Sequence, residues 1–357
     1  MNYIGSKLSL LDFLEQSINK IVNKRDNNVF CDLFAGTGAV GLHFKKKGFK
    51  VIANDIQYYS YVLNRHYIGN HKTLRFSKLS NEIFSLKNIK LNDRKNFICD
   101  YLNNLDGIKG FIYNNYCLGG TKNKKIERLY FSDENGMRCD AIRKKIEDWK
   151  NKKLINDNEY YFLLTSLLES IDKYANTASV YGAFLKKLKK SALNSLILKP
   201  AELVINDQDH QVYNEDINKV VKDIKGDILY LDPPYNHRQY ATNYHILETI
   251  AKSDNPEIHG KTGLRDYKNQ KSFYCSRIEV KKAFKDLILK AKVKYIFLSY
   301  NNEGLMKPED VKEVMSLRGK YGFFTQEYSR FKADKTENRN YKANKTVEYL
   351  HYVICQS

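Results

Sequence analysis

The chain has 357 residues, 42% of them hydrophobic, which is enough for one large elaborated domain or for two domains with buried cores. Its formal net charge of +19 favours a polyanionic partner, most simply nucleic acid. The six cysteines form no C-x-x-C pair, which argues against a zinc site or a disulfide framework, and no apolar run approaches the ~20 residues of a membrane span.

The segment Tyr3–Lys7 comes first and leads into apolar residues whose later spacing predicts an amphipathic helix. A glycine, a hydroxyl and a lysine at a helix start are typical of a cap. They are also suited to hold an anionic group, because the amino end of a helix attracts negative charge. On these residues alone we favour the cap.

A strand–turn–helix–strand pattern follows. Val29–Leu33 predicts a buried strand, and Lys50–Asp55 predicts a second strand that ends in an acid. Between them Gly36, Gly38 and Gly41 spell G-x-G-x-x-G. In this context the glycines let a nucleotide approach the backbone, and the acid is placed to bind ribose hydroxyls. The pattern indicates an adenosine-containing cofactor, either NAD or S-adenosylmethionine, with a purely structural glycine turn as the alternative.

The α/β alternation stops from about residue 58 to residue 200, where the sequence is polar and rich in Asn, Lys and Tyr. Asp140–Trp149 and Tyr160–Tyr174 predict helices, and Asp133–Gly136 predicts a turn. A lysine run after Tyr181 contains no acid and is either a solvated face or a holder of phosphates. We interpret the whole insertion as a mainly helical lobe for substrate recognition.

The α/β pattern then resumes. Val212–Asp216 and Lys294–Asn301 predict strands, and Gly322–Ser329 with Thr346–Cys355 predicts a terminal hairpin. A further strand, Asp227–Leu231, leads directly into the string Asp-Pro-Pro-Tyr.

The string Asp232-Pro233-Pro234-Tyr235 must end its strand, because proline has no N–H to give to a sheet. In an open α/β sheet ligands bind beyond the carboxyl ends of the strands. A carboxylate, a stiff carbonyl and an aromatic ring at that place suit a flat substrate with an exocyclic amine. Asp232 and the Pro233 carbonyl can accept hydrogen bonds from the amine, and Tyr235 can stack on the ring. The alternative is a proline turn with a capping Asp and an exposed Tyr.

The glycine turn, written Asp32-Leu33-Phe34-Ala35-Gly36-Thr37-Gly38, together with the downstream Asp-Pro-Pro-Tyr, resembles the N6-adenine DNA methyltransferases. The order of the segments, with a long insertion between the two motifs, is similar to the alpha arrangement of that family, which includes the Dam-like and FokI-type modification enzymes. The resemblance implies an α/β fold with a Rossmann-like S-adenosylmethionine-dependent methyltransferase sheet and a reversed terminal strand. It implies a catalytic domain over residues 1–70 and 206–357, with a mainly helical target-recognition domain inserted over residues 71–205.

The resemblance also implies roles for single residues. Catalytic roles fall to Asp232, Pro233 and Tyr235. Binding of S-adenosylmethionine falls to Tyr3, Lys7, Asp32, Phe34, Gly36, Gly38, Asp55, Ile56 and Asp216. DNA contacts are expected from Lys186, Lys187, Lys190, Arg238, Arg330, Lys332 and Arg339. No metal is expected to be required.

The expected reaction is methyl transfer to a flipped-out adenine of a specific double-stranded DNA site, as part of a restriction-modification system with a cognate restriction endonuclease. We expect a cytoplasmic enzyme of bacterial type that is associated with the nucleoid through DNA and has no membrane partner. The alternatives are an RNA or cytosine-N4 methyltransferase of the same fold, a nicotinamide dehydrogenase and a non-catalytic DNA-binding protein. A nuclease is disfavoured, because no convincing metal-carboxylate cluster is found in the sequence.

Overall fold

The computed structural model describes residues 3–23, 27–329 and 345–356. The chain divides into two compact units. One unit comprises Arg65–Ile205 and Thr242–Tyr267 together with Tyr3, and the other comprises the described residues of Ile4–Asn64, Asn206–Ala241 and Lys268–Ser357. We call the first the helical unit and the second the sheet unit. Helix α11 (Tyr240–Asn243) crosses the boundary between them along the chain.

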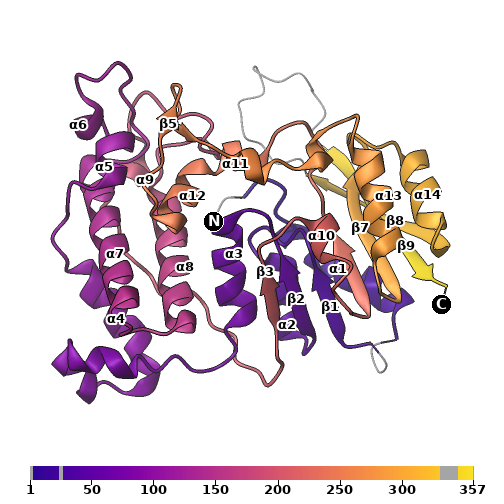
Figure 1. The fold of residues 1–357 in the computed structure, drawn as a ribbon, viewed down its shortest axis with the longest axis horizontal. Coiled ribbons are helices and arrows are strands. Elements are labelled where there is room, and N and C mark those ends of the chain that lie inside the picture. Colours follow the sequence, from indigo (N-terminus) through magenta and orange to yellow (C-terminus); the bar gives the residue numbers. More distant parts are fainter. Residues whose placement is uncertain (1–2, 24–26, 330–344, 357) are drawn as a thin grey trace. The chain divides into compact units, whose positions relative to one another are not determined.

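The sheet unit contains a seven-stranded sheet in the order β3-β2-β1-β4-β7-β9-β8 (Figure 1). Its strands are β1 (Val29–Asp32), β2 (Lys50–Asn54), β3 (Gln211–Tyr213), β4 (Ile228–Leu231), β7 (Tyr295–Asn301), β8 (Gly319–Ser329) and β9 (Lys345–Cys355). Strands β3, β2, β1, β4 and β7 are mutually parallel, and β9 runs antiparallel to both β7 and β8. The structure is thus a mixed α/β fold with a mostly parallel central sheet, compatible with a Rossmann-like methyltransferase.

Strand β4 shows that the centre of the sheet is covered on both faces. All four of its residues are buried, as the continuous apolar run Ile228-Leu229-Tyr230-Leu231 predicts for a central parallel strand. Leu229 and Leu231 pack in a core with Phe284 and Leu287 of α13 and Val314 of α14. The helices of this unit are α1 (Leu11–Ile21), α2 (Ala39–Lys46), α3 (Tyr58–Asn64), α10 (Ile217–Val220), α13 (Val280–Lys290) and α14 (Pro308–Ser316). Short 3-10 turns cover Leu8–Leu10, Lys268–Gln270 and Phe273–Cys275.

The helical unit is built around two long helices, α7 (Asp133–Asn151) and α8 (Asp157–Tyr174), which pack on each other. The other helices are α4 (Arg94–Asn103), α5 (Phe111–Tyr116), α6 (Leu118–Thr121), α9 (Lys190–Leu193) and α12 (His245–Lys252). Short helical turns cover Arg65–Gly69, Ser77–Asn81, Phe84–Asn88 and Leu91–Asp93, and β5 (Ile258–His259) pairs antiparallel with β6 (Leu264–Arg265). Among the described residues no helix has the length and apolar composition that crossing a membrane requires.

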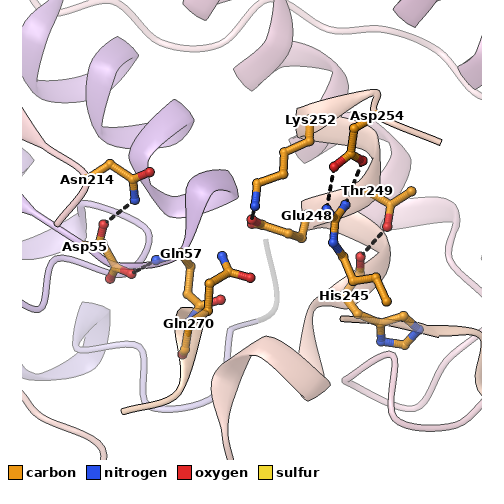
Figure 2. A network of polar contacts seen from close by, with 10 residues as sticks. Asp55, Gln57, Asn214, His245, Glu248, Thr249, Lys252, Asp254 and Gln270 are labelled. Atoms are coloured by element: carbon orange, nitrogen blue, oxygen red, sulfur yellow. Dashed lines mark hydrogen bonds and ion pairs between the residues drawn. The ribbon is translucent and has the colours of Figure 1, made fainter. Parts of the chain in front are cut away.

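Polar contacts tie α12 into the helical unit. Arg143 of α7 donates from Nε to the carbonyl of Ile250 at 2.8 Å and from Nη2 to the Tyr160 hydroxyl at 3.1 Å. Figure 2 shows part of α12, where Lys252 forms an ion pair of 2.8 Å with the buried Glu248. The contact of Arg143 with Ile250 joins α12 to α7, although the two helices are distant in sequence.

The predicted turn at Asp133–Gly136 is wrong, because these residues form the first turn of α7. The Ser132 side chain caps this helix by accepting a hydrogen bond from the Asn135 backbone N–H. Gly136 serves close packing here rather than a turn, since a Cβ atom at that position would clash with Cys117 Sγ. The other predicted strands and helices named above are present, with small shifts at their ends.

Candidate functional site

Four acids gather at one edge of the sheet. Because β1, β2, β3 and β4 are parallel, their carboxyl ends lie at the same edge. Asp32 ends β1, Asp55 follows β2, Asp216 begins the turn into α10 after β3, and Asp232 follows β4. From β1 the chain continues outward to β2 and β3 and then returns to β4 on the other side of β1. This reversal between β1 and β4 is the place where open α/β sheets bind ligands.

The glycine turn between β1 and α2 is held in a conformation that suits glycine. Gly36 and Gly38 have φ of 51° and 79°. The buried Asn64 of α3 donates from Nδ2 to the Gly36 carbonyl at 3.0 Å, while its Oδ1 atom has no hydrogen-bond partner among the described residues. The two glycines therefore leave the turn without side chains that would keep a ligand from its backbone, and an unused acceptor lies beside it.

Asp32 is buried next to this turn. Its Oδ2 atom accepts the Gly41 backbone N–H at 3.1 Å, and its Oδ1 atom has no hydrogen-bond partner within the described chain. Burial and the nearby Asp232 carboxylate raise the pKa of Asp32 to about 8. A buried carboxylate with an open oxygen is the arrangement expected where a cationic ligand supplies the missing partner.

Asp55 is held by hydrogen bonds from three residues, of which Gln57 and Asn214 are labelled in Figure 2. Its Oδ2 atom accepts from the Gly36 N–H at 2.8 Å and its Oδ1 atom accepts from the Gln57 N–H at 2.8 Å, while Asn214 donates to its carbonyl at 2.7 Å. Each carboxylate oxygen has two lone pairs, so Asp55 can still accept hydrogen bonds from a ligand. Ile56 beside it is half-buried.

Two more predicted cofactor residues lie in the sheet unit. Phe34 is half-buried, and its ring meets Tyr274 edge-on with centroids 4.9 Å apart. Asp216 caps α10, with Oδ1 accepting the Asn218 N–H at 2.8 Å. Tyr3 belongs to the helical unit, where its ring stacks on Tyr244 at 4.7 Å.

Lys7 forms two buried ion pairs that the sequence did not predict. Its Nζ atom lies 3.1 Å from Asp232 Oδ1 and 3.0 Å from Glu348 Oε1, and its side chain is only 5% exposed. Burial by itself lowers the pKa of a lysine, but the carboxylates of Asp232 and Glu348 raise the pKa of Lys7 well above its ordinary value. Lys7 is therefore charged and joins the Asp-Pro-Pro-Tyr motif to the reversed strand β9.

Asp232 remains accessible within this cluster, with 18% of its side chain exposed. Burial raises its pKa to about 6; Lys7 opposes the rise, and Glu348 adds to it. The carboxylate is therefore mostly ionised at neutral pH and yet retains a higher proton affinity than an ordinary Asp. It can accept hydrogen bonds strongly and can also take up a proton.

The residues after Asp232 are fixed by contacts within the sheet unit. Pro233 is buried and Tyr235 is half-buried, with the Tyr235 carbonyl accepting the Leu305 N–H at 3.1 Å. Gln239 exchanges hydrogen bonds with the Ser272 backbone at 2.8 and 3.2 Å. Gly5 has φ of 78°, and a Cβ atom there would lie 3.0 Å from the Tyr240 hydroxyl and 3.9 Å from that of Tyr235. The amino-terminal segment thus passes close to the motif.

The predicted DNA-binding residues are distributed over both units. Lys186, Lys187 and Lys190 are exposed in the helical unit, and Arg238 is exposed in the sheet unit. Arg330, Lys332 and Arg339 lie outside the described residues. Within the described ranges, no group of three or more His, Cys, Asp or Glu residues could hold a metal ion.

Sequence reasoning missed three polar residues at this edge: Asn54, Asn64 and Glu348. Asn54 ends β2 and bonds to the Leu33 carbonyl and to both backbone groups of Glu215. Glu348 is buried on a strand face that it shares with Leu350. A lone acid on the apolar face of a predicted strand is the signal that could have found it.

The glycine turn and the Asp-Pro-Pro-Tyr motif follow the adjacent parallel strands β1 and β4. Comparison with known proteins shows the family. Residues 3–315 match the model of the family described as D12 class N6 adenine-specific DNA methyltransferase. The chain belongs to this family. It is an adenine-specific DNA methyltransferase, which decides against the dehydrogenase, RNA, cytosine-N4 and binding-only alternatives.

Curated relatives share this similarity over nearly the whole chain. Type II methyltransferase M.NlaIII of Neisseria lactamica is 54% identical over 98% of both chains. Type II methyltransferase M.CviAII of Paramecium bursaria Chlorella virus 1 is 36% identical over 100% of this chain and 99% of its own. Type II methyltransferase M.FokI of Planomicrobium okeanokoites is 40% identical over 99% of this chain, which spans 52% of that relative.

Proposed function

We propose that this methyltransferase uses S-adenosylmethionine to methylate a flipped-out adenine within a specific double-stranded DNA sequence, as the modification enzyme of a restriction-modification system. The names of the relatives, Type II methyltransferases and modification methylases, support the last part. On this reading the enzyme acts in the cytoplasm of a bacterial-type cell, at the nucleoid, alongside a cognate endonuclease.

The observation that carries the proposal is the pair of acids flanking the reversal of the sheet. Asp32 ends β1 with an open buried oxygen, and Asp232 follows the adjacent strand β4 with its carboxylate partly exposed. The first suits a cationic cofactor and the second suits a neutral amine. A methyl donor and its acceptor held at adjacent strand ends are in the relation that transfer requires.

The donor set fits S-adenosylmethionine. The open acceptors Asp32 Oδ1 and Asn64 Oδ1 lie beside the glycine turn, and the half-buried Phe34 belongs to the same segment between β1 and α2. Asp55 and Ile56 would receive the ribose and adenine, and Asp216 the adenine amine. Tyr3 and Lys7 would approach the methionine end. When bound, the cofactor supplies an electrophilic methyl group on a sulfonium.

Asp232 and Pro233 would act on the target amine. The lone pair of adenine N6 is delocalised into the ring and is a poor nucleophile. Two acceptors that draw its hydrogens toward tetrahedral geometry free this lone pair, so their interaction strengthens in the transition state. Asp232 need not deprotonate the neutral amine, because the acidic proton appears only after transfer, when a carboxylate of raised pKa can accept it.

Tyr235 would hold the extruded base, since N6 cannot be reached inside a duplex. Its ring can replace part of the lost base stacking. We assign target recognition to the insertion over residues 71–205 and catalysis to residues 1–70 and 206–357, with the reversed strand β9 completing the methyltransferase sheet. In support, residues 65–205 fold together as a helical unit with exposed lysines at 186, 187 and 190.

The proposal is tested by incubating the protein with methyl-labelled S-adenosylmethionine and unmethylated plasmid DNA, followed by methylation-sensitive sequencing. We expect label in N6-methyladenine at one short sequence motif. Label spread over all adenines would contradict site specificity. Failure of S-adenosylmethionine to bind the folded protein in calorimetry would contradict the cofactor assignment.

A further inference from the structure

One buried cation in the sheet unit is shared by two carboxylates. Lys7 Nζ lies 3.1 Å from Asp232 Oδ1 and 3.0 Å from Glu348 Oε1, while Lys7 and Glu348 are 5% and 1% exposed. We call these three residues the lysine cluster. Burying charges at such depth costs folding free energy, because removing charges from water is unfavourable. A buried cluster of three charges is therefore a candidate for a functional role. The proposed function assigns a role to Asp232 but none to Glu348.

The topology of the sheet explains how Glu348 reaches this place. Strands β4 and β9 lie on opposite sides of β7, and β9 is antiparallel to β7. Glu348, near the start of β9, is paired with Asn301 at the carboxyl end of β7. A parallel final strand would put its fourth residue at the opposite edge. The reversal therefore delivers Glu348 to the edge at which Asp232 emerges, with Lys7 joining them across the end of β7.

The two contacts of Lys7 differ in kind. Asp232 receives both the charge and a hydrogen bond from the ammonium. Glu348 Oε1 receives charge alone, because it has no hydrogen-bond partner of good geometry in the part of the chain that the structure describes. Glu348 thus acts on the ammonium through its charge, and the hydrogen bond is reserved for Asp232.

We propose that Glu348 is a positioning residue for methyl transfer, which shares the Lys7 ammonium with Asp232 and so keeps the Asp232 carboxylate a strong acceptor for the adenine amine. A lysine paired with Asp232 alone would neutralise more of that charge. With no lysine, two buried carboxylates would repel and Asp232 would hold a proton. Sharing one cation between two acids sets Asp232 between these extremes. This inference rests on the proposed role of Asp232.

The titration of Asp232 reports this balance. The charged and titratable groups that face it come from each element around it: Lys7, Asp32 at the end of β1, Tyr230 of β4, Tyr235 and Glu348 of β9. Lys7 holds the pKa of Asp232 down, and Glu348 holds it up. Removing either partner must move that pKa, in opposite directions.

The test compares Glu348→Gln, which keeps shape but removes charge, with Lys7→Met. In the protein without cofactor or DNA, carboxyl NMR identifies the Asp232 signal as the one absent from Asp232→Asn. Glu348→Gln should lower the pKa of Asp232 by roughly one unit, and Lys7→Met should raise it by at least as much. The matched control is Glu327→Gln, an exposed glutamate on the adjacent strand β8, which should leave it unchanged.

The same variants are then assayed for single-turnover methyl transfer to unmethylated plasmid DNA over about pH 5 to 9. The pH at which the rate falls on the acidic side should shift with the NMR pKa. The plateau rate for Glu348→Gln should fall by up to about tenfold, which is the limit for one pKa unit if the rate followed the basicity of Asp232 in full. The inference would be overturned if Glu348→Gln lowered the rate while the pKa of Asp232 and the pH dependence of the rate stayed unchanged. Glu348 would then only support the fold.

Two further variants keep the outcome decisive. If Glu348→Gln does not fold, Glu348→Asp retains the charge one methylene further away, and a smaller shift in the same direction supports the inference while no shift overturns it. If Asp232→Ala keeps its activity, the proposed role of Asp232 fails. If Asp232→Ala is inactive and the pKa of Asp232 ignores Glu348, only the inference fails.

Discussion

A Cβ atom on residue 38 would lie 2.8 Å from Asn64 Oδ1, closer than a real side chain tolerates. Gly38 also has φ of 79°, a conformation that L-residues adopt at a cost of roughly 1–2 kcal/mol. Glycine is therefore required twice over at this point, by the backbone and by Asn64. Since Asn64 also bonds to the Gly36 carbonyl, a side chain at residue 38 would displace the group that orders the turn.

We expect Gly38→Ala to weaken S-adenosylmethionine binding at least tenfold, and Gly38→Val to abolish it, while the protein stays folded. The matched control is Gly48→Ala. Gly48 has φ of 86°, but a Cβ atom there would meet nothing within 4 Å, so the substitution adds only backbone strain. Calorimetric titration with S-adenosylmethionine measures the affinities. Equal losses in both variants would assign the effect to strain and remove the cofactor site from this turn.

Asp32 should make the unliganded protein less stable as the pH rises. Its pKa is about 8 in the folded chain and about 3.8 ordinarily, so between these values the native state binds the extra proton. The free energy of unfolding must fall with pH across that range because of this group. Asp32→Asn removes this fall while keeping an acceptor for the Gly41 N–H.

Denaturant unfolding of the free protein at several values between about pH 5 and 8 measures this effect. The advantage of Asp32→Asn over the parent should grow with pH, and its affinity for S-adenosylmethionine should drop because the cation loses its partner. Asp12→Asn, at an exposed carboxylate on α1, is the control. A stability difference that does not change with pH would show that Asp32 is ionised in the folded protein over this range, as it is in the unfolded chain.

The core of this molecule was predictable from local patterns. The apolar runs at Val29–Leu33 and Ile228–Leu231 specify buried strands, and the prolines after Asp232 specify where the second one ends. Parallel strands bring their carboxyl ends together, so the meeting of Asp32, Asp55 and Asp232 at one edge followed from the order of the elements. The turn predicted at Asp133–Gly136 failed because a capping serine outweighs the turn propensity of Asn and Gly.

The lysine cluster was not predictable in the same way. Lys7 and Glu348 are separated by nearly the whole chain, and their contact depends on β9 entering the sheet beside β7 in the reverse direction. Local spacing indicated that Lys7 belongs to a helix cap or contacts a ligand. Neither interpretation predicts an ion pair with a residue as distant in sequence as Glu348. Asn64 was missed for a similar reason, because its role depends on how α3 packs against the glycine turn.

The exposed lysines of the helical unit should carry part of the DNA affinity. Replacing Lys186, Lys187 and Lys190 together with Ala should weaken binding to plasmid-length duplex most at low salt, with little effect on S-adenosylmethionine binding. Each lost phosphate contact reduces the slope of log affinity against log salt by about 0.9. The control replaces Lys78, Lys87 and Lys90, which are also exposed in this unit, and should leave the salt slope unchanged. An unchanged salt slope in the first variant would move the phosphate contacts elsewhere.

Tyr235 should act through its ring rather than its hydroxyl. Tyr235→Phe should retain most of the activity, whereas Tyr235→Ala should lose stacking worth about 1–3 kcal/mol and weaken capture of the extruded adenine. A fluorescent base analogue at the target position, once the recognition site is known, reports base flipping directly. If Tyr235→Phe lost as much as Tyr235→Ala, the hydroxyl near Gly5 would be the functional group instead.

The sharpest prediction concerns Asp232→Ala. If the carboxylate draws the hydrogens of the adenine amine toward tetrahedral geometry, its loss should cut the single-turnover methyl-transfer rate by roughly 10²–10³, as for other preorganised polar groups. Affinities for DNA and S-adenosylmethionine should change little, because the interaction strengthens mainly in the transition state. Asp227→Ala is the matched control, since Asp227 precedes the same strand at its opposite end and bonds to the Val29 N–H. It should alter stability rather than the rate of the folded enzyme.

An Asp232→Ala enzyme that methylates near the parent rate would mean that the Pro233 carbonyl and base positioning suffice. The role of the lysine cluster would then be structural.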